Sequence, residues 1–493
     1  MTRTAYIPFG GGIDLTTPVR QVEPGRCLFA VNYECPTTGG YRRIEGYTQL
    51  GSELPGTGPV LGVVTFADHY YAVREDVAGG TASLYRYDTA AGTWSVVTDT
   101  AGVLEANRHE FIEGNFLATT QGRALYAVGK GQPWELKADG SFRILSNAPS
   151  GAKFIAIHQN HLMLGFEAGS IQHSGVGDPN NWDAATGGAG EFGVSQEVRG
   201  LLSGRGGVLH IGCRDSIKGL FGTIPQEWQI KITVPNSGPK AYSMRSFTEP
   251  YFVAERGISG LQASNDFGDF APVLPGAPIQ PLFTNEGYAE RVVASMVSKR
   301  RAQYRVFFND KTGIYWSPSG ATTVEFPDQI TVADGGELDS GEESLLIGDA
   351  AGRVHQMDDG ASSFNGTAIT AFLTLAFTDL NAPGTKKRYR RAFFDIDSGN
   401  EQTISVRPEL DYGDIESAKQ LRFFLDYQNT GGLWNVNAWD QFAWSAPVLA
   451  TEPVDVAGSG ESIGFSIYSA GTTKPHVLYG YTLNYEPRRR LRG

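Results

Sequence analysis

A short strand-like motif recurs seven times along this chain and constrains its fold more than any other feature. Each copy joins a Gly- or Asp-rich turn to a short apolar run, at steps of 39 to 54 residues that average about 45. One residue from each apolar run marks the series: Tyr85, Tyr126, Gln172, Leu220, Leu261, Tyr315 and Val354. Four strands and four short loops account for such a period. Because one such unit cannot bury its faces alone, the repeat predicts a β-propeller of six or seven blades.

Large aromatic residues follow the same period a few positions later. The series consists of Trp94, Trp134, Trp182, Trp228 and Phe270. Between apolar runs the chain places Asn, Asp and Gly, which tolerate the backbone angles of tight hairpins. The 62 glycines of the chain suit a fold made mostly of hairpins.

The pattern divides the chain into three parts. Residues 1–55 are irregular and rich in Gly, Pro and Thr, and the repeat occupies residues 56–361. Residues 362–493 contain longer strands with strict alternation, as at Ile463, Phe465 and Ile467. Alternation of this kind indicates a sheet with one buried face. We therefore predict an all-β protein in which a β-propeller is joined to a C-terminal β-sandwich platform.

The net charge of −12 and a pI near 5.2 argue against a protein that coats nucleic acid, which needs a basic face. The charge is unevenly distributed. Residues 386–391 (KKRYRR) and the C-terminal RRRLRG are basic, whereas residues 334–360 are acidic. These stretches are either solvated loops and tails or charge-complementary docking surfaces between subunits.

Three cysteines, Cys27, Cys35 and Cys213, and the absence of a CxxC motif give no disulfide framework, and pairing of Cys27 with Cys35 stays open. The N-terminus has no apolar segment typical of a secretion signal. The longest apolar runs are too short to cross a bilayer. We expect a protein made in the cytoplasm without a membrane anchor.

Motifs that carry chemistry are missing from the sequence. There is no P-loop, no GxSxG and no HExxH. His158 and His161 flank a hairpin turn, which is a more common setting for such a pair than a metal site. Propeller sialidases carry repeated Asp boxes, and here only Asp88, Gly92 and Trp94 come near one. We predict no enzyme activity, no catalytic residue, no cofactor and no metal.

Three tryptophans, Trp434, Trp439 and Trp444, gather within eleven residues of the C-terminal part. They either pack locally under a long connection or form an interface hot spot, because exposed tryptophans are costly unless a partner buries them.

The first fifty residues resemble a known family. The matching pieces are Gly12–Leu15, Asn32–Glu34 and, most specifically, Gly39–Tyr47 (GGYRRIEGY), and residues 174–183 (SGVGDPNNWD) are similar to a further stretch. They resemble tail nozzle proteins of short-tailed, podovirus-type bacteriophages, which are also called packaged-DNA-stabilisation or tail accessory proteins. Close agreement covers about a tenth of the chain, and the family's β-propeller on a β-rich platform agrees with the repeat.

The resemblance implies a structural virion protein located in the tail. Such proteins form a ring, usually of six copies, below the portal and its adaptor ring, and they contact tail fibre or tailspike proteins. The channel is closed after packaging and conducts the genomic DNA during ejection without sequence-specific binding. The net negative charge suits this role, because an acidic lumen repels phosphates.

Within the resembling segment, Tyr41, Arg42, Arg43 and Tyr47 are candidate interface residues, since arginine bridges carboxylates and tyrosine packs flat. We expect residues 1–55 to lie against the C-terminal platform and not on the propeller. An alternative function is a propeller that binds or cleaves cell-surface glycan for host recognition, for which aromatic rims and acidic loops are suitable.

Overall fold

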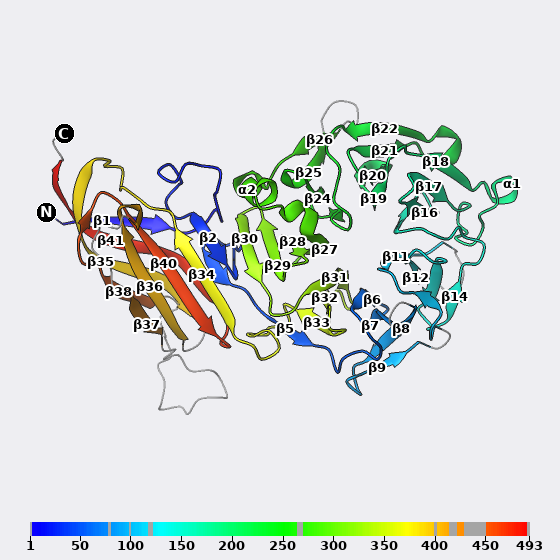
Figure 1. The fold of residues 1–493 in the computed structure, drawn as a ribbon, viewed down its shortest axis with the longest axis horizontal. Coiled ribbons are helices and arrows are strands. Elements are labelled where there is room, and N and C mark those ends of the chain that lie inside the picture. Colours follow the sequence, from blue (N-terminus) through cyan, green and yellow to red (C-terminus); the bar gives the residue numbers. More distant parts are fainter. Residues whose placement is uncertain are drawn as a thin grey trace.

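The protein is described by a computed structural model that covers residues 2–76, 80–97, 100–116, 122–263, 270–398, 402–413, 422–427 and 450–490. A ring of radial sheets lies beside a domain of two long-stranded sheets that holds both chain ends (Figure 1). Two short α-helices, α1 (Ala184–Gly187) and α2 (Gln280–Thr284), occur in the described residues. None of the helices described is long and apolar enough to cross a membrane.

The first three units of the ring are antiparallel sheets of consecutive strands. Unit one holds β6 (Val60–Phe66), β7 (His69–Glu75), β8 (Thr81–Asp88), β9 (Thr93–Val96) and β10 (Leu104–Glu105). Unit two holds β11 (Glu110–Gly114), β12 (Ala124–Val128), β13 (Trp134–Lys137) and β14 (Phe142–Ile144). Unit three holds β15 (Phe154–His158), β16 (His161–Phe166), β17 (Ser170–His173) and β18 (Gly190–Gly193).

The remaining units follow the same plan, and the last one borrows its outermost strand from the N-terminal segment. Unit four holds β19 (Val198–Ser203), β20 (Leu209–Cys213), β21 (Ile217–Phe221) and β22 (Gln229–Val234). Unit five holds β23 (Arg245–Ser246), β24 (Pro250–Ala254), β25 (Gly257–Ala263) and β26 (Phe270–Val273). Unit six holds β27 (Val292–Ser298), β28 (Gln303–Phe308), β29 (Thr312–Ser317) and β30 (Gly320–Glu325). Unit seven holds β31 (Ile330–Glu337), β32 (Glu343–Asp349), β33 (Val354–Met357) and β5 (Tyr47–Gln49).

The units form a closed ring. The first strands of most neighbouring units lie together around the centre, and β31 of the last unit contacts β6 of the first. Gly348 permits this closure, since an added Cβ would lie 2.6 Å from Val60 of unit one. The β5 strand precedes unit one in the chain and pairs with β33 of unit seven, so the start and the end of the propeller are held in one sheet.

The predicted all-β propeller is confirmed. Six of its units are separate sheets in the described residues, and the seventh four-stranded unit, β27–β30, is part of a nine-stranded sheet. Six of the seven residues that mark the repeat lie on the third strand of a unit, but Tyr126 lies on the second strand of unit two, where Trp134 opens the third. The repeat period therefore located the units, although one copy is displaced by a strand.

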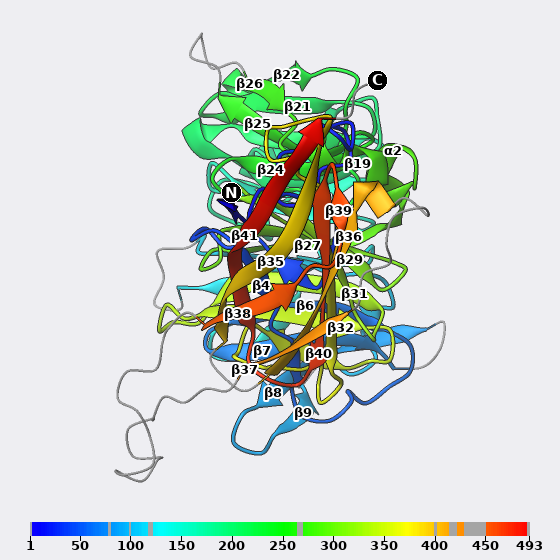
Figure 2. The same cartoon turned by 90° about the vertical axis from the view of Figure 1, so that its left-hand side faces the viewer.

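The domain beside the ring has two sheets. The terminal sheet holds β1 (Arg3–Pro8), β3 (Tyr33–Glu34), β4 (Tyr41–Arg43), β35 (Thr385–Ser398), β38 (Ala450–Asp455), β39 (Ser459–Gly460) and β41 (His476–Arg490). The shared sheet extends unit six beyond β30 with β2 (Cys27–Val31), β34 (Ile369–Leu375), β40 (Ile463–Gly471), β36 (Gln402–Leu410) and β37 (Phe423–Tyr427). Figure 2 views the domain from the end that is remote from the ring, with β41, β35 and β38 in front.

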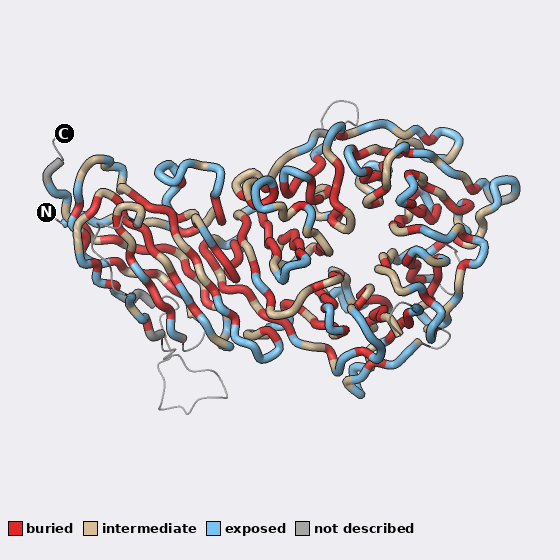
Figure 3. Tube along the Cα trace, in the orientation of Figure 1, coloured by how far each residue is buried: buried red, intermediate tan, exposed pale blue. Residues whose placement is uncertain are grey.

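The apolar core between these two sheets is continuous with buried residues of units five and six of the ring. Phe394 of β35 packs against Phe465 of β40 with ring centroids 5.1 Å apart, and Tyr481 of β41 packs 4.8 Å from Phe465. Side chains on β40 alternate between this core and the outer face, as the sequence pattern predicts. Figure 3 shows the buried residues concentrated in the strands of both parts.

The N-terminal segment differs from the expected arm. β1 and β4 pair with β41, which places them on the C-terminal domain. However, β5 is a strand of unit seven, and β2 joins β30 of unit six to β34. The expectation that residues 1–55 avoid the propeller therefore needs correction. The reason is the unpaired edge of β33, whose backbone groups need a partner strand.

Candidate functional site: the N-terminal junction

Tyr41 and Arg43, two of the candidate interface residues, are buried inside the chain. The Tyr41 hydroxyl lies 2.8 Å from the carbonyl oxygen of Gly10 and 3.0 Å from that of Gly25, so it holds the N-terminal loop in place. The Arg43 guanidinium donates to the carbonyl oxygens of Thr473 and Lys474, which precede β41. Tyr41 thus holds the N-terminal segment together, and Arg43 fastens it to the C-terminal domain.

Tyr47 closes the propeller. Its side chain is buried, and its hydroxyl donates to Asp328 Oδ2 at 2.6 Å. Its ring packs against His355 of β33 and Phe364, with centroids 4.5 and 5.1 Å apart. The β5 strand is therefore attached to unit seven by side chains as well as by its backbone.

Asp328, Asp349 and His355 have ligand atoms within 4.8 Å of one another and are a candidate metal group. Arg353 already lies between the two carboxylates, with Nη2 2.6 Å from Asp328 and Nε 2.8 Å from Asp349. His355 Nε2 lies 3.1 Å from Asp349. Because a guanidinium provides the positive charge that a metal ion would supply, we interpret the group as a structural clasp at the ring closure.

The clasp shifts the acidity of Asp349. Burial alone would raise the pKa of its carboxyl, but hydrogen bonds from His355 and from the Arg353 backbone N–H, together with the charge of Arg353, hold the pKa below its ordinary value. The carboxylate is therefore more stable in the folded chain than in the unfolded chain.

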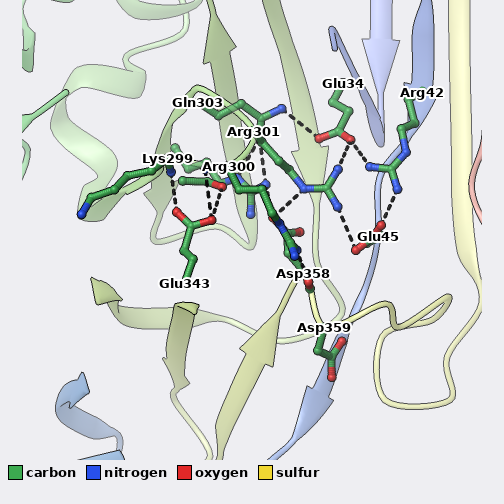
Figure 4. Close-up of polar contacts among 12 residues, drawn as sticks. Glu34, Arg42, Glu45, Lys299, Arg300, Arg301, Gln303, Glu343, Asp358 and Asp359 are labelled. Atoms are coloured by element: carbon green, nitrogen blue, oxygen red, sulfur yellow. Dashed lines mark hydrogen bonds and ion pairs between the residues drawn. The ribbon is translucent and has the colours of Figure 1, made fainter. Parts of the chain in front are cut away.

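Arg42 lies in a network of charged residues where the N-terminal segment, unit six and unit seven meet (Figure 4). It contacts Glu34 at 2.8 Å and also Glu45. Arg301, from the turn between β27 and β28, lies 2.8 Å from each of these carboxylates and 2.8 Å from Asp358, which follows β33. Two arginines from distant parts of the chain thus share the same two glutamates.

The network continues into the core of unit six. Arg305, which has no exposed surface, lies 2.6 Å from Asp358, and its guanidinium stacks 4.3 Å from the ring centre of Tyr315. Gln303 donates to Glu34 at 2.8 Å and accepts from Arg305 at 2.9 Å. Burial raises the pKa of Glu34, while Arg305 and Arg42 oppose that rise. Removing one member of such a buried group leaves an uncompensated charge, which costs about 3–5 kcal/mol.

The structure therefore brings Arg42 to the joint between the two parts, Tyr47 to the closure of the propeller, and Tyr41 and Arg43 to the C-terminal domain. All four contact other residues of the same chain. The remaining candidates, Trp434, Trp439 and Trp444, lie outside the described residues. The sequence analysis missed the partners Glu34, Arg301, Arg305 and Asp358. Their only signals are the basic turn Lys299–Arg301 and the adjacent acids Asp358 and Asp359.

His158 and His161 pair across the β15–β16 hairpin, and both are buried. The ring of His161 lies 5.1 Å from Trp228, and the ring of His173 lies 4.9 Å from it. His161 and His173 both direct Nδ1 toward the carbonyl oxygen of Ser174, at 2.6 and 3.0 Å. Burial lowers the pKa of His158 to about 4. These histidines form an aromatic cluster between units three and four.

Polar side chains also meet across the centre of the ring. Arg108, which precedes β11, donates to the carbonyl oxygen of Thr331 at 2.8 Å and lies 3.8 Å from the ring centre of Tyr242. Glu110 lies 3.3 Å from Arg108 and 3.8 Å from Arg245. These contacts link units two, five and seven.

A pocket of about 590 Å³ opens beside this centre, between units one, two and seven. Its charged lining includes Arg123, Lys299 and Asp334. Burial raises the pKa of Asp334 to about 6, and Arg245 opposes the rise. Arg123 is paired with Glu113 and Asp339, and Lys299 with Glu337, so most of the charges that line the pocket are neutralised within it.

All three cysteines are buried and free. Burial raises the pKa of the Cys27 thiol to about 12 and that of Cys213 to about 11, and it also raises the pKa of Cys35. No disulfide links Cys27 to Cys35, which settles the pairing that the sequence left open.

No protein family and no curated protein matches this chain. Among solved structures, Raptor of Chaetomium thermophilum is similar at 11% identity and a TM-score of 0.45, over 64% of this chain and 30% of the Raptor chain. The WD40 repeats of RRP9 are similar at 10% identity and a TM-score of 0.41, over 66% of this chain and 99% of that one. The computationally designed Ika8 protein is similar at 15% identity and a TM-score of 0.38, over 63% of this chain and 99% of that one. No functional argument follows from these similarities.

Proposed function

We propose that this chain is a structural protein of a bacteriophage virion: the nozzle at the far end of a short tail. Copies form a ring, usually of six, below the portal and its adaptor ring, and tail fibre or tailspike proteins dock on it. The ring retains the genomic DNA after packaging and conducts it during ejection. We propose no catalytic step, so the chain acts by assembling and by opening a channel.

The observation that carries this proposal is the position of residues 39–47, the segment that resembles nozzle proteins most closely. This segment forms β4 on the C-terminal domain and reaches the first residue of β5 in unit seven; Arg42 of β4 and Glu45, between the two strands, belong to the charged junction. The resembling residues therefore connect the propeller to the second domain. A segment with this role suits a subunit whose two parts must keep a fixed relation inside a ring.

The net charge supports the same proposal. Each copy adds −12 to the ring, so a lumen that shares this charge repels DNA phosphates and allows the DNA to slide. In the pocket beside the ring centre, Arg123 and Lys299 are each paired with a carboxylate, and so is Arg42 in the buried junction. These cations are therefore already neutralised and do not form a cluster that would bind phosphate.

Immunogold labelling of purified phage particles tests the proposal. An antibody raised against this chain should place gold at the far end of a short tail, and particles of an unrelated phage provide the control. Label absent from the particles, with the protein left in the soluble fraction, would refute a virion role. Release of reducing sugar from host capsule or lipopolysaccharide by the purified chain would instead favour the glycan-cleaving alternative.

A further inference from the structure

A second pocket lies in the C-terminal domain. Its volume of about 560 Å³ is within the range of about 300–1,000 Å³ that is usual for ligand sites. Three connections of the chain form its walls: the segment between β34 and β35, the turn Asp411–Gly413 after β36, and the residues before β40. We call it the domain pocket, and its polar lining includes Arg20, Asp379, Lys386, Asp411, Glu461 and Ser462.

Buried polar contacts hold the walls of the domain pocket in place. Lys387, which has no exposed surface, donates from Nζ to the carbonyl oxygens of Ala382, Thr385 and Glu461, at 2.9, 3.0 and 2.8 Å. Asp411 Oδ1 accepts from the backbone N–H of Glu461 at 2.6 Å. One ammonium group and one carboxylate thus join all three connections. A site whose walls are fixed before binding loses less conformational entropy when a ligand enters.

The turn after β36 is strained and positions a cation at the pocket. Tyr412 has a φ of 61°, in the left-handed region that a bulky side chain rarely adopts. Strain of this kind persists where surrounding contacts impose it, and it is common at binding sites. The Tyr412 ring packs on Phe377 with centroids 4.8 Å apart, and the guanidinium of Arg20 lies 5.4 Å from its centre. The turn therefore holds Arg20 beside the pocket.

The charged side chains of the domain pocket are not paired with one another. Arg20 and Lys386 are exposed, and neither forms an ion pair with a residue that the structure describes. By contrast, both cations of the pocket beside the ring centre are paired. Asp379 and Glu461 likewise have no ion-pair partner within the described ranges. The domain pocket therefore offers two cations and two carboxylates to a ligand.

Ser462 adds an unused hydrogen-bonding group to the wall. Its side chain is buried, and its Oγ has no hydrogen-bond partner among the described residues. A buried hydroxyl group without a partner reduces stability. A ligand that carries hydroxyl groups would supply the missing partner.

The lining excludes several classes of ligand. Among the lining residues, only Pro383 and Tyr412 have a large apolar surface, so an apolar ligand would gain little from burial here. Three carboxylates line the pocket against two cations, so its charge repels a polyanion such as nucleic acid. The remaining choice is a ligand with few negative charges and many hydroxyl groups.

The unpaired groups match a carboxylated sugar. A guanidinium and an ammonium group bind a carboxylate through charge-assisted hydrogen bonds, and protein carboxylates accept from sugar hydroxyl groups. We propose that the domain pocket binds a saccharide that carries a carboxylate, with Arg20 and Lys386 on the carboxylate and Asp379 and Glu461 on the hydroxyl groups. This site adds to the proposed function and does not depend on it.

Binding of the purified full-length chain to a glycan array tests the inference. The array pairs saccharides that contain uronic or sialic acids with neutral saccharides of the same chain length. The wild-type chain should bind members of the acidic set and leave the neutral set unbound. Isothermal titration calorimetry with the best-bound saccharide then gives its dissociation constant. Binding to neither set, or to both sets equally, would overturn the inference.

Variants of the lining assign the binding to the domain pocket. The double variant R20S/K386S should weaken binding about tenfold or more, because it removes both cations that contact the carboxylate. R3S/R388S is the matched control, since it removes the same charge from exposed positions of β1 and β35 outside the pocket, and it should bind like the wild type. Equal affinity of R20S/K386S and the wild type would overturn the inference.

The S462A variant separates binding from stability. Its unfolding midpoint should be unchanged or higher, because the hydroxyl group that it removes has no described partner in the chain. Its affinity for the saccharide should nevertheless fall severalfold. Acetate serves as a probe for the carboxylate alone. If acetate binds as tightly as the saccharide, the pocket is a site for any small anion and the inference is wrong.

Discussion

The N-terminal segment is attached to the two parts of the molecule by different chemistry. On the C-terminal domain, Arg43 donates to the backbone carbonyl oxygens of Thr473 and Lys474, which are neutral acceptors. At the ring, Arg42 and Tyr47 contact carboxylates that belong to networks of charged side chains. A hydrogen bond to a backbone carbonyl oxygen depends little on the side chain of the residue that accepts it. The charged joint, in contrast, depends on several side chains from distant positions, so single substitutions should have their largest effect there.

Removal of the Asp358 charge should have the largest effect. The D358N variant keeps the size of the side chain and suits the positive φ of 55° at this position, but it leaves Arg305 without its carboxylate in a fully buried site. We expect a loss of about 3–5 kcal/mol in the free energy of unfolding, measured by urea denaturation. D359N is the control, because Asp359 is exposed and its contact to the Ala361 N–H remains possible with an amide. Equal stability of both variants would contradict a structural role for the network.

Loss of the Tyr47 hydroxyl should have the next largest effect. The Y47F variant keeps the ring contacts with His355 but removes the 2.6 Å hydrogen bond to Asp328. Hydrogen bonds to charged groups contribute about 1.5–3 kcal/mol, so we expect a loss in that range. Hydrogen exchange should accelerate first in β5 and β33, where the ring closes. Y87F is the control, since the Tyr87 ring packs on Trp94 within unit one.

The ring closure should also be sensitive to acid. Because the pKa of Asp349 is lowered on folding, the unfolded chain binds more protons than the folded chain below the ordinary aspartate pKa of about 3.9. The contribution of Asp349 is therefore complete above that value and disappears as the pH falls through the lowered pKa. Urea midpoints measured across this window should fall less steeply for D349N than for the wild type. If the urea midpoints of D349N and the wild type fall equally steeply with pH, the Asp349 carboxylate does not contribute to the stability of the ring closure.

The sequence predicted the propeller because its repeat is local: six of the seven units are each built from one continuous segment with its own turns. β5 and the charged junction escaped prediction because they join residues far apart in the chain. Arg42 and Arg301 carry no signal that they share Glu34, and Tyr47 lies in a segment with no repeat. The same limit applies to the domain pocket, where Arg20 and Lys386 meet Glu461 from a third part of the chain.

The smallest effect should come from replacing Arg42 by lysine, which tests how far the charged joint depends on the planar guanidinium group. Lysine keeps the positive charge but cannot bridge Glu34 and Glu45 with one planar group. Arg301 still contacts both glutamates, so the joint keeps a cation and the loss should be about 1 kcal/mol. R388K, at an exposed position of β35, should leave the urea midpoint unchanged. A loss with R42K as large as that with D358N would mean that Arg301 does not compensate for Arg42 and that the Arg42 contacts stabilise the fold as much as the buried Arg305–Asp358 pair between units six and seven.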